Sequence, residues 1–132
     1  MNPIRILLAD DHSLFRRGIA SLLATESDFA VIGEAVDGRQ ALEMARALRP
    51  DLILMDISMP GMDGLEATRR IRAEMPRVRV VIFTASHRAC GPLEAVQCGA
   101  QGYLAKKADP QALYSTLRGV AQGEAPTPWP HR

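Results

Sequence analysis

The stretch DLILMDISMPGMDG, residues 51–64, is the part of this sequence that decides the fold and the candidate site. Its apolar run, residues 52–55, is typical of a short buried strand, and it ends abruptly at Asp56. Because an unpaired charge is costly inside a core, a carboxylate at this point needs a chemical reason. We therefore predict that Asp56 is a phosphoryl-accepting nucleophile and that the rest of the chain builds a site around it.

Length and composition limit the class of protein. The chain has 132 residues, which suits one domain, and 47% of them are hydrophobic, which is enough for a core. Its 16 basic and 15 acidic side chains give a formal net charge of +1, which does not support direct nucleic-acid binding or an anionic membrane surface. No apolar run approaches the ~20 residues that span a bilayer, and residues 1–5 lead into a strand pattern without a signal peptide.

The two cysteines, Cys90 and Cys98, lie eight residues apart. On one helix that spacing rises ~12 Å, which is beyond the reach of a disulfide. No CxxC pattern or histidine cluster accompanies them, so a metal site is disfavoured. We expect free thiols in a cytoplasmic protein, because a reducing compartment keeps thiols free.

Strand and helix patterns alternate five times along the chain. Apolar runs predict strands over residues 4–9, 29–32, 52–55, 78–84 and 102–105. The residues expected to begin or end the helices between them are Ser13, Asp63, Asp109, Pro50, Pro76, Gly99 and Gly123. The alternation predicts an α/β fold with a doubly wound, five-stranded parallel sheet and helices on both faces. Right-handed crossovers leave few topologies, and among them we expect the flavodoxin-like strand order 2-1-3-4-5.

Polar side chains suited to catalysis or ligand binding lie at or just after the ends of four of the predicted strands. They are Asp10 and Asp11 after the first, Asp56 after the third, Thr84 at the end of the fourth and Lys106 after the fifth. In an open parallel sheet, ligands bind beyond the carboxyl ends of the strands, where the strand order reverses. We therefore expect these side chains to lie together at the edge of the sheet formed by the carboxyl ends of the strands, which we call the rim. Residues 33–35, which follow the second strand, have no matching position in this site.

The rim needs a counter-charge, because three neighbouring carboxylates repel one another. Mg²⁺ supplies it, since this ion takes oxygen ligands in octahedral geometry and keeps several waters. Lys106 adds a positive charge on a flexible stem, and Thr84 adds a hydroxyl donor, both suited to phosphoryl oxygens. Together these groups predict a phosphoryl-transfer site that works by positioning and charge neutralisation.

Each of these features also has an ordinary structural explanation. An Asp-Asp pair after a strand commonly starts a loop or caps a helix, a strand-terminal Thr is a common β-former, and two adjacent lysines are commonly solvated. Their combination favours a site, because separate strands bring matching chemistry to one rim. His12 is expected to be a loop residue and not a ligand, since Mg²⁺ prefers oxygen.

The combined motifs resemble the receiver domains of two-component response regulators, and most of all the NarL/FixJ (LuxR-type) group. The matching segments are ADDH (9–12), DLILMDISMPGMDG (51–64), TA (84–85), GAQGYLAK (99–106) and DP (109–110), within a resemblance over about residues 4–122. It implies that Asp56 accepts a phosphoryl group from the phosphohistidine of a sensor histidine kinase.

The resemblance also implies roles for the other residues of the rim. The implied set is Asp10, Asp11, Asp56 and the backbone carbonyl of Ser58 for Mg²⁺, with Thr84 and Lys106 for the phosphoryl group. Ser58 and Ser86 would line the rim, where family members tune hydrolysis of the acyl phosphate; solvated loop residues are the ordinary alternative.

A switch is implied in the same way. In the family, the hydroxyl at the Thr84 position moves toward the phosphate, and the aromatic side chain at the Tyr103 position turns inward behind it. The ordinary explanation of Tyr103 is an aromatic residue on an edge strand, with a packed ring and a solvated hydroxyl.

Two features depart from the family pattern. Gly91 and Pro92 stand where such receivers carry an acidic, helix-favouring stretch, and proline is tolerated at the first position of a helix but not in its interior. We predict a short fourth helix that begins near Pro92 after a long loop. The second departure concerns the helix-turn-helix DNA-binding domain that usually follows the receiver in this group. We assign residues 1–123 to the receiver and 124–132 to a proline-rich tail or the start of a linker, and we find no helix-turn-helix pattern in residues 124–132.

Three classes of function compete. The leading one is a phosphorylation-switched signalling domain, not a true enzyme, that either controls a helix-turn-helix DNA-binding domain or acts alone through protein partners. A phosphatase with an aspartyl-phosphate intermediate needs an acid-base carboxylate two residues after the nucleophile, where this chain has Ser58. The third class is a phosphorylation-independent scaffold. Loss of one of the acidic, Thr or Lys positions of the rim would favour it, and none of them is lost.

The helix faces of residues 13–24 and 109–122 could form a homodimer on phosphorylation; ordinary solvation of these faces is the alternative.

Overall fold

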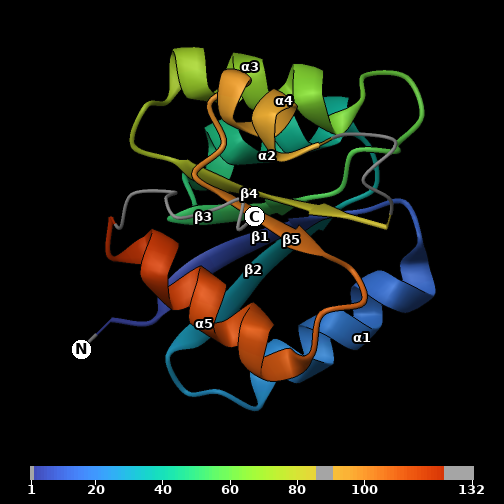
Figure 1. The fold of residues 1–132 in the computed structure, drawn as a ribbon. Coiled ribbons are helices and arrows are strands. Elements are labelled where there is room, and N and C mark those ends of the chain that lie inside the picture. The colour runs from blue at the N-terminus through green and yellow to red at the C-terminus, as the bar shows by residue number, and fades with distance from the viewer. Residues whose placement is uncertain (1, 86–90, 124–132) are drawn as a thin grey trace.

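Strands and helices alternate in the computed structural model, which describes residues 2–85 and 91–123. The strands are β1 (Ile4–Ala9), β2 (Phe29–Ala35), β3 (Leu52–Met55), β4 (Arg79–Thr84) and β5 (Gly102–Ala105). The helices are α1 (Ser13–Ala24), α2 (Gly38–Leu48), α3 (Gly64–Glu74), α4 (Pro92–Gln97) and α5 (Pro110–Ala121). The sheet is parallel throughout, in the order β2-β1-β3-β4-β5, which confirms the predicted fold (Figure 1).

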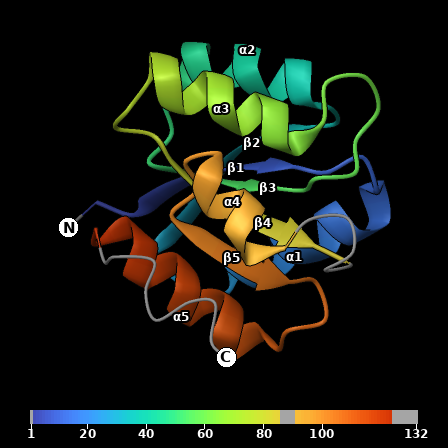
Figure 2. The same cartoon turned by 45° about the horizontal axis from the view of Figure 1, so that its top comes forward.

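Helices cover both faces of the sheet. α1 and α5 pack on one face, and α2, α3 and α4 pack on the other (Figures 1 and 2). Successive side chains of a strand point to opposite faces. In β3, Leu52 and Leu54 therefore join the core under α1 and α5, whereas Ile53 and Met55 join the core under α2 and α3. All four side chains are buried, which explains the unbroken apolar run before Asp56.

The helix ends agree with the sequence at most positions. Asp63 and Asp109 cap α3 and α5, each through a side-chain oxygen that accepts a backbone N–H three residues later. Gly99 and Gly123 follow α4 and α5 with φ angles of 99° and 82°, a conformation that favours glycine. The cap predicted at Ser13 is wrong: Ser13 is the first residue of α1, the N-cap is His12, and no side chain caps it.

The second strand is longer than predicted. It continues past Ile32 to Ala35, with Glu34 and Ala35 opposite Leu8 and Ala9 of β1. A glycine and a glutamate interrupt the apolar pattern there, so the sequence resembles a turn. The structure accepts Glu34 in the strand because its carboxylate pairs with Arg16 of α1, with the Nε and Oε1 atoms 2.7 Å apart. β2 therefore reaches the same edge of the sheet as β1.

The prediction of a short fourth helix is confirmed. α4 begins at Pro92 and has six residues, and the backbone N–H of Gly91 donates to Glu94 Oε1 at 2.9 Å. The long loop predicted before it falls largely on residues 86–90, with Ser86 and Cys90, which lie outside the described ranges, as does the predicted tail at 124–132. Cys98 at the end of α4 is buried. In the ranges that the structure describes, every helix is too short or too polar to cross a membrane.

Candidate functional site

The carboxyl ends of the strands bring the predicted residues together. Asp10 directly follows β1, Asp56 follows β3, Thr84 is the last residue of β4 and Lys106 follows β5. Backbone bonds continue the ladders to these positions: Asp56 N–H donates to Ala9 O at 2.9 Å, and Lys106 N–H donates to Thr84 O at 2.8 Å. Asp10, Asp56 and Thr84 are all buried. The prediction that these residues share one rim is correct.

Lys106 connects the two buried carboxylates. Its Nζ atom lies 2.8 Å from Asp10 Oδ2 and 3.4 Å from Asp56 Oδ2. The ammonium group also lies 4.6 Å from the centroid of the Phe15 ring on α1, a distance at which cation and ring attract. A long side chain is thus held in one place by two charges and one aromatic face.

The acidic pair is organised by its own loop. Asp10 Oδ1 accepts the backbone N–H of His12 at 2.8 Å, and His12 Nδ1 lies 3.1 Å from the same oxygen and 3.4 Å from Asp11 Oδ1. Each of Asp10, Asp11, His12 and Asp56 offers a ligand atom within 4.8 Å of the others. His12 lies in the loop before α1, as predicted, and most of its side chain is exposed.

Asp56 has one satisfied oxygen and one unsatisfied oxygen. Oδ1 accepts the N–H of Ile57 at 2.9 Å, whereas Oδ2 is buried and accepts no well-aligned hydrogen bond from the part of the chain that the structure describes. Burial raises the pKa of Asp56, and the nearby charge of Asp10 raises it further, while Lys106 opposes both effects. A carboxylate oxygen in this position suits a hard cation, which would satisfy the lone pairs and favour the ionised form.

The loop after Asp56 depends on a close backbone approach. The N–H groups of Met59 and Gly64 both donate to Ile57 O at 3.0 Å. A methyl group on Gly64 would overlap the carbonyl oxygen of Asp56, so only glycine fits at the start of α3. Ser58, whose carbonyl the family resemblance assigns to Mg²⁺, is exposed in this loop two residues after Asp56.

The two residues of the expected switch lie on neighbouring strands. Thr84 is buried at the end of β4, opposite Ala105 of β5. Tyr103 is half-buried in β5, where its ring packs against the core under α2, α3 and α4. The packed ring agrees with the ordinary explanation of Tyr103. The residue lies in β5, on the strand next to the one that ends at Thr84.

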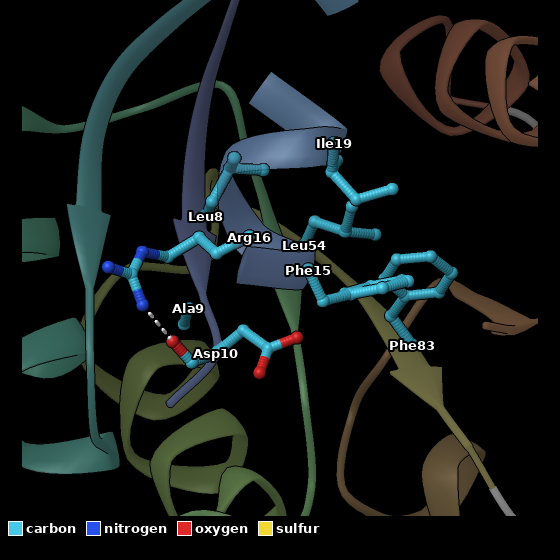
Figure 3. A pocket seen from close by; sticks show the side chains of 8 residues that line it. All are labelled: Leu8, Ala9, Asp10, Phe15, Arg16, Ile19, Leu54 and Phe83. Carbon is cyan, nitrogen blue, oxygen red and sulfur yellow. Dashed lines mark hydrogen bonds between the residues drawn. The ribbon is translucent and has the colours of Figure 1, made fainter. Parts of the chain in front are cut away.

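Sequence reasoning missed two charged residues next to the rim. Arg16 Nη1 donates to the backbone carbonyl of Asp10 at 2.7 Å (Figure 3). Its Nε donates to Glu34 of β2. A signal was present, because Arg16, Ile19 and Leu23 have the spacing of one buried helix face and all are buried in α1. The expectation that residues 33–35 have no position in the site is therefore incomplete, since Glu34 contacts it through Arg16.

A sequence-family model described as "Response regulator receiver domain" matches residues 6–118, most of the chain. The chain belongs to this family. The receiver is 42% identical over 122 residues to "Nitrate/nitrite response regulator protein NarL" of Escherichia coli K12, a match that covers 92% of this chain and 56% of that protein. It is 40% identical over 124 residues to "Transcriptional regulatory protein DegU" of Brevibacillus brevis, covering 94% of this chain and 52% of that one.

Solved receiver structures have the same architecture. A LuxR-family two-component response regulator from Aurantimonas is 35% identical, with a TM-score of 0.89 over 96% of this chain and 90% of that one. The signal receiver domain of a NarL regulator from Mycobacterium tuberculosis is 34% identical, with a TM-score of 0.87 over 94% of this chain and 100% of that one. The chain is thus a receiver of the NarL/LuxR type, and it spans about half the length of the curated relatives it matches.

Proposed function

We propose that Asp56 accepts a phosphoryl group from a sensor histidine kinase in a Mg²⁺-dependent reaction, and that this transfer switches a transcriptional output. The observation that carries the proposal is Asp56 Oδ2. This oxygen is buried and unsatisfied among the described residues, and it faces the Lys106 ammonium at 3.4 Å. An acceptor oxygen with a fixed cation beside it is suited to a reaction that develops charge on phosphoryl oxygens.

The residues of the rim divide the work of this transfer. A carboxylate oxygen of Asp56 attacks phosphorus, and the bond between phosphorus and the donor breaks. Lys106 pairs with one phosphoryl oxygen, and the Thr84 hydroxyl donates to another. Asp10, Asp11, Asp56 and the Ser58 carbonyl would hold Mg²⁺, which when bound neutralises charge on the carboxylates and on the phosphoryl group.

The acyl phosphate is then stored, and signalling follows from it. The position two residues after Asp56 is Ser58, which offers no carboxylate to activate water, so we propose slow autodephosphorylation and not enzymatic turnover. Movement of Thr84 toward the phosphate, followed by Tyr103, would change the surface near β5 and α4. Leu93 and Val96 of α4 are exposed apolar side chains on that surface, where an output domain could bind. For a homodimer formed on phosphorylation we propose the faces of α1 and α5.

Intact mass spectrometry tests the proposal. The protein is incubated with Mg²⁺ and acetyl phosphate, and we expect a gain of one phosphoryl group that chelation of Mg²⁺ and Asp56→Asn both abolish. Asp51→Asn is the matched control, because Asp51 precedes β3 at the opposite end of the same strand. Absence of a mass gain in the wild type would leave only a phosphorylation-independent scaffold, and rapid multiple-turnover release of phosphate would indicate a phosphatase.

A further inference from the structure

We propose that Arg16 is a positioning residue that holds Asp10 in place for Mg²⁺, an inference that rests on the function proposed above. The Arg16 side chain, on α1, is only 9% exposed. A buried guanidinium is costly unless its N–H groups find acceptors, so its partners indicate its role. Those partners are Glu34 Oε1 and the backbone carbonyl of Asp10, each 2.7 Å away.

The hydrogen bond from Arg16 to the Asp10 carbonyl lies just beyond the last paired residue of β1. The ladders of β1 with β2 and with β3 both end at Ala9. Beyond that point the N–H of Asp10 donates to Ala35 O at 3.0 Å, and Arg16 binds the carbonyl. In Figure 3 the carbonyl of Asp10 points toward Arg16, while the carboxylate points away from it. Arg16 therefore fixes the backbone from which the carboxylate projects, without reaching the rim itself.

Glu34 determines the direction of the guanidinium. Its Oε1 accepts from Nε, and this bond leaves Nη1 of Arg16 directed at Asp10. The planar fork of arginine suits two acceptors at once, whereas a lysine ammonium is a single compact charge on a flexible stem. The Glu34 side chain is 31% exposed, so it can be hydrated when Arg16 is removed, and we expect such variants to fold.

A purely structural role for Arg16 predicts a different result. If the ion pair only joins α1 to β2, its loss lowers the free energy of unfolding and leaves the affinity for Mg²⁺ unchanged. If Arg16 positions Asp10, its loss weakens Mg²⁺ binding, because hydrogen bonds outside the ligand shell set how a ligand is oriented. Measuring Mg²⁺ affinity and stability separately distinguishes these alternatives.

The first experiment is a Mg²⁺ titration of the unphosphorylated protein, followed by the amide chemical shifts of the rim. We expect Arg16→Met to weaken binding about tenfold, a usual size for loss of an outer-shell partner. Arg16→Lys should restore only part of it. Arg118→Met is the matched control: Arg118 is another arginine with two acceptors, here the carboxylates of Asp28 and Glu26, but it lies near the start of β2, so its loss should leave the affinity unchanged.

The second experiment varies Mg²⁺ while the rate of phosphorylation by acetyl phosphate is measured. We expect Arg16→Met to raise the half-saturating Mg²⁺ concentration by about the same factor, with a rate at saturation close to that of the wild type. Glu34→Ala should cause a smaller shift in the same direction. Because Glu34 acts through Arg16, Glu34→Ala should add nothing in the Arg16→Met background.

Four results would overturn the inference. Wild-type affinity in Arg16→Met, or an equal loss in Arg118→Met, would show that Arg16 does not position Asp10. If Arg16→Met does not fold, wild-type affinity in Glu34→Ala would have the same meaning. If the wild type binds no Mg²⁺, the proposed function fails together with this inference, whereas an unaffected variant beside a competent wild type contradicts this inference alone.

Discussion

Lys106 and Asp10, which lie near opposite ends of the receiver sequence, form an ion pair with 2.8 Å between Nζ and Oδ2. The same ammonium lies 3.4 Å from Asp56 Oδ2 and stands over the Phe15 ring. One cation thus balances two buried carboxylates. Without it, those carboxylates would face each other across a site of low solvent access, where like charges repel strongly.

We expect Lys106→Met to lower the free energy of unfolding by about 2 kcal/mol without Mg²⁺, because it leaves buried carboxylates without their counter-charge. Mg²⁺ should bind this variant more tightly than the wild type, since no ammonium group competes for Asp10, and phosphorylation should be slower. Urea unfolding with and without Mg²⁺ measures the first two effects. Lys107→Met is the control, because Lys107 is exposed; an equal loss of stability there would contradict the explanation.

The pKa of Asp56 predicts a stability that depends on pH. Burial raises this pKa, so between the ordinary value and the raised value the folded protein holds a proton that the unfolded chain has released. Stability from this group therefore falls as pH rises through that window. Asp56→Asn removes the ionisation and should be more stable than the wild type at neutral pH, by about 1 kcal/mol, with the gain lost at acidic pH.

Asp28 provides a control of opposite sign. Its hydrogen bond with Arg118 lowers the pKa of Asp28, so the carboxylate stabilises the fold above its ordinary pKa and loses that effect as pH falls. Asp28→Asn should therefore be less stable than the wild type at neutral pH and should approach it in acid. Urea midpoints across the acidic and neutral range measure both variants, and parallel pH profiles for the two would refute the assignment of causes.

The close approach at Gly64 predicts strain in any variant with a larger side chain. Gly64→Ala places a methyl group against the Asp56 carbonyl and should cost about 1–3 kcal/mol, with slower phosphorylation because the loop must move. Gly18→Ala is the control: the site is exposed in α1, nothing lies near the added methyl group, and helix propensity should stabilise it by about 0.5–1 kcal/mol. Thermal unfolding compares the two, and equal shifts would contradict this account.

The hydrogen bond from the Gly91 N–H to Glu94 predicts that the stability of α4 depends on its N-terminal cap. Glu94→Ala removes the acceptor of the Gly91 N–H and should destabilise the six-residue helix by about 1 kcal/mol, with faster amide hydrogen exchange at Ala95. Glu94→Gln keeps an acceptor oxygen and should change exchange little. Unaltered exchange in Glu94→Ala would mean that packing, and not the cap, determines where α4 begins.

The fold and most of the candidate rim follow from patterns that are local in sequence. Four strands, β1, β3, β4 and β5, are short and mainly apolar, and the last residue of each is followed at once by Asp10, Asp56 or Lys106, or is itself Thr84. Parallel strands end at one edge, so knowing where each strand ends is enough to group these residues. Pro92 similarly predicts the start of α4, because proline is tolerated there and not further inside a helix.

Two predictions were wrong, and for one of them a contact between distant residues overrides the local pattern. The end of β2 was missed because Glu34 is polar, and only its pairing with Arg16 makes a strand possible there. Ser13 has the composition of a cap but lies inside α1. The end of β2 cannot be read from the neighbouring residues, because the deciding partner, Arg16, comes from another element; nothing in the structure explains why Ser13 is not the cap.

The sequence by itself determined the alternation of strands and helices, the parallel sheet that this alternation implies and the identity of the side chains at the rim, because hydrophobic periodicity and strand ends are properties of short segments. Only the tertiary structure decided that Lys106 joins Asp10 to Asp56, that Arg16 holds the Asp10 carbonyl, and that one oxygen of Asp56 accepts no hydrogen bond from residues 2–85 and 91–123. The physical reason is that hydrogen bonds and ion pairs depend on distances of about 3 Å between groups far apart in the chain, and only packing sets those distances.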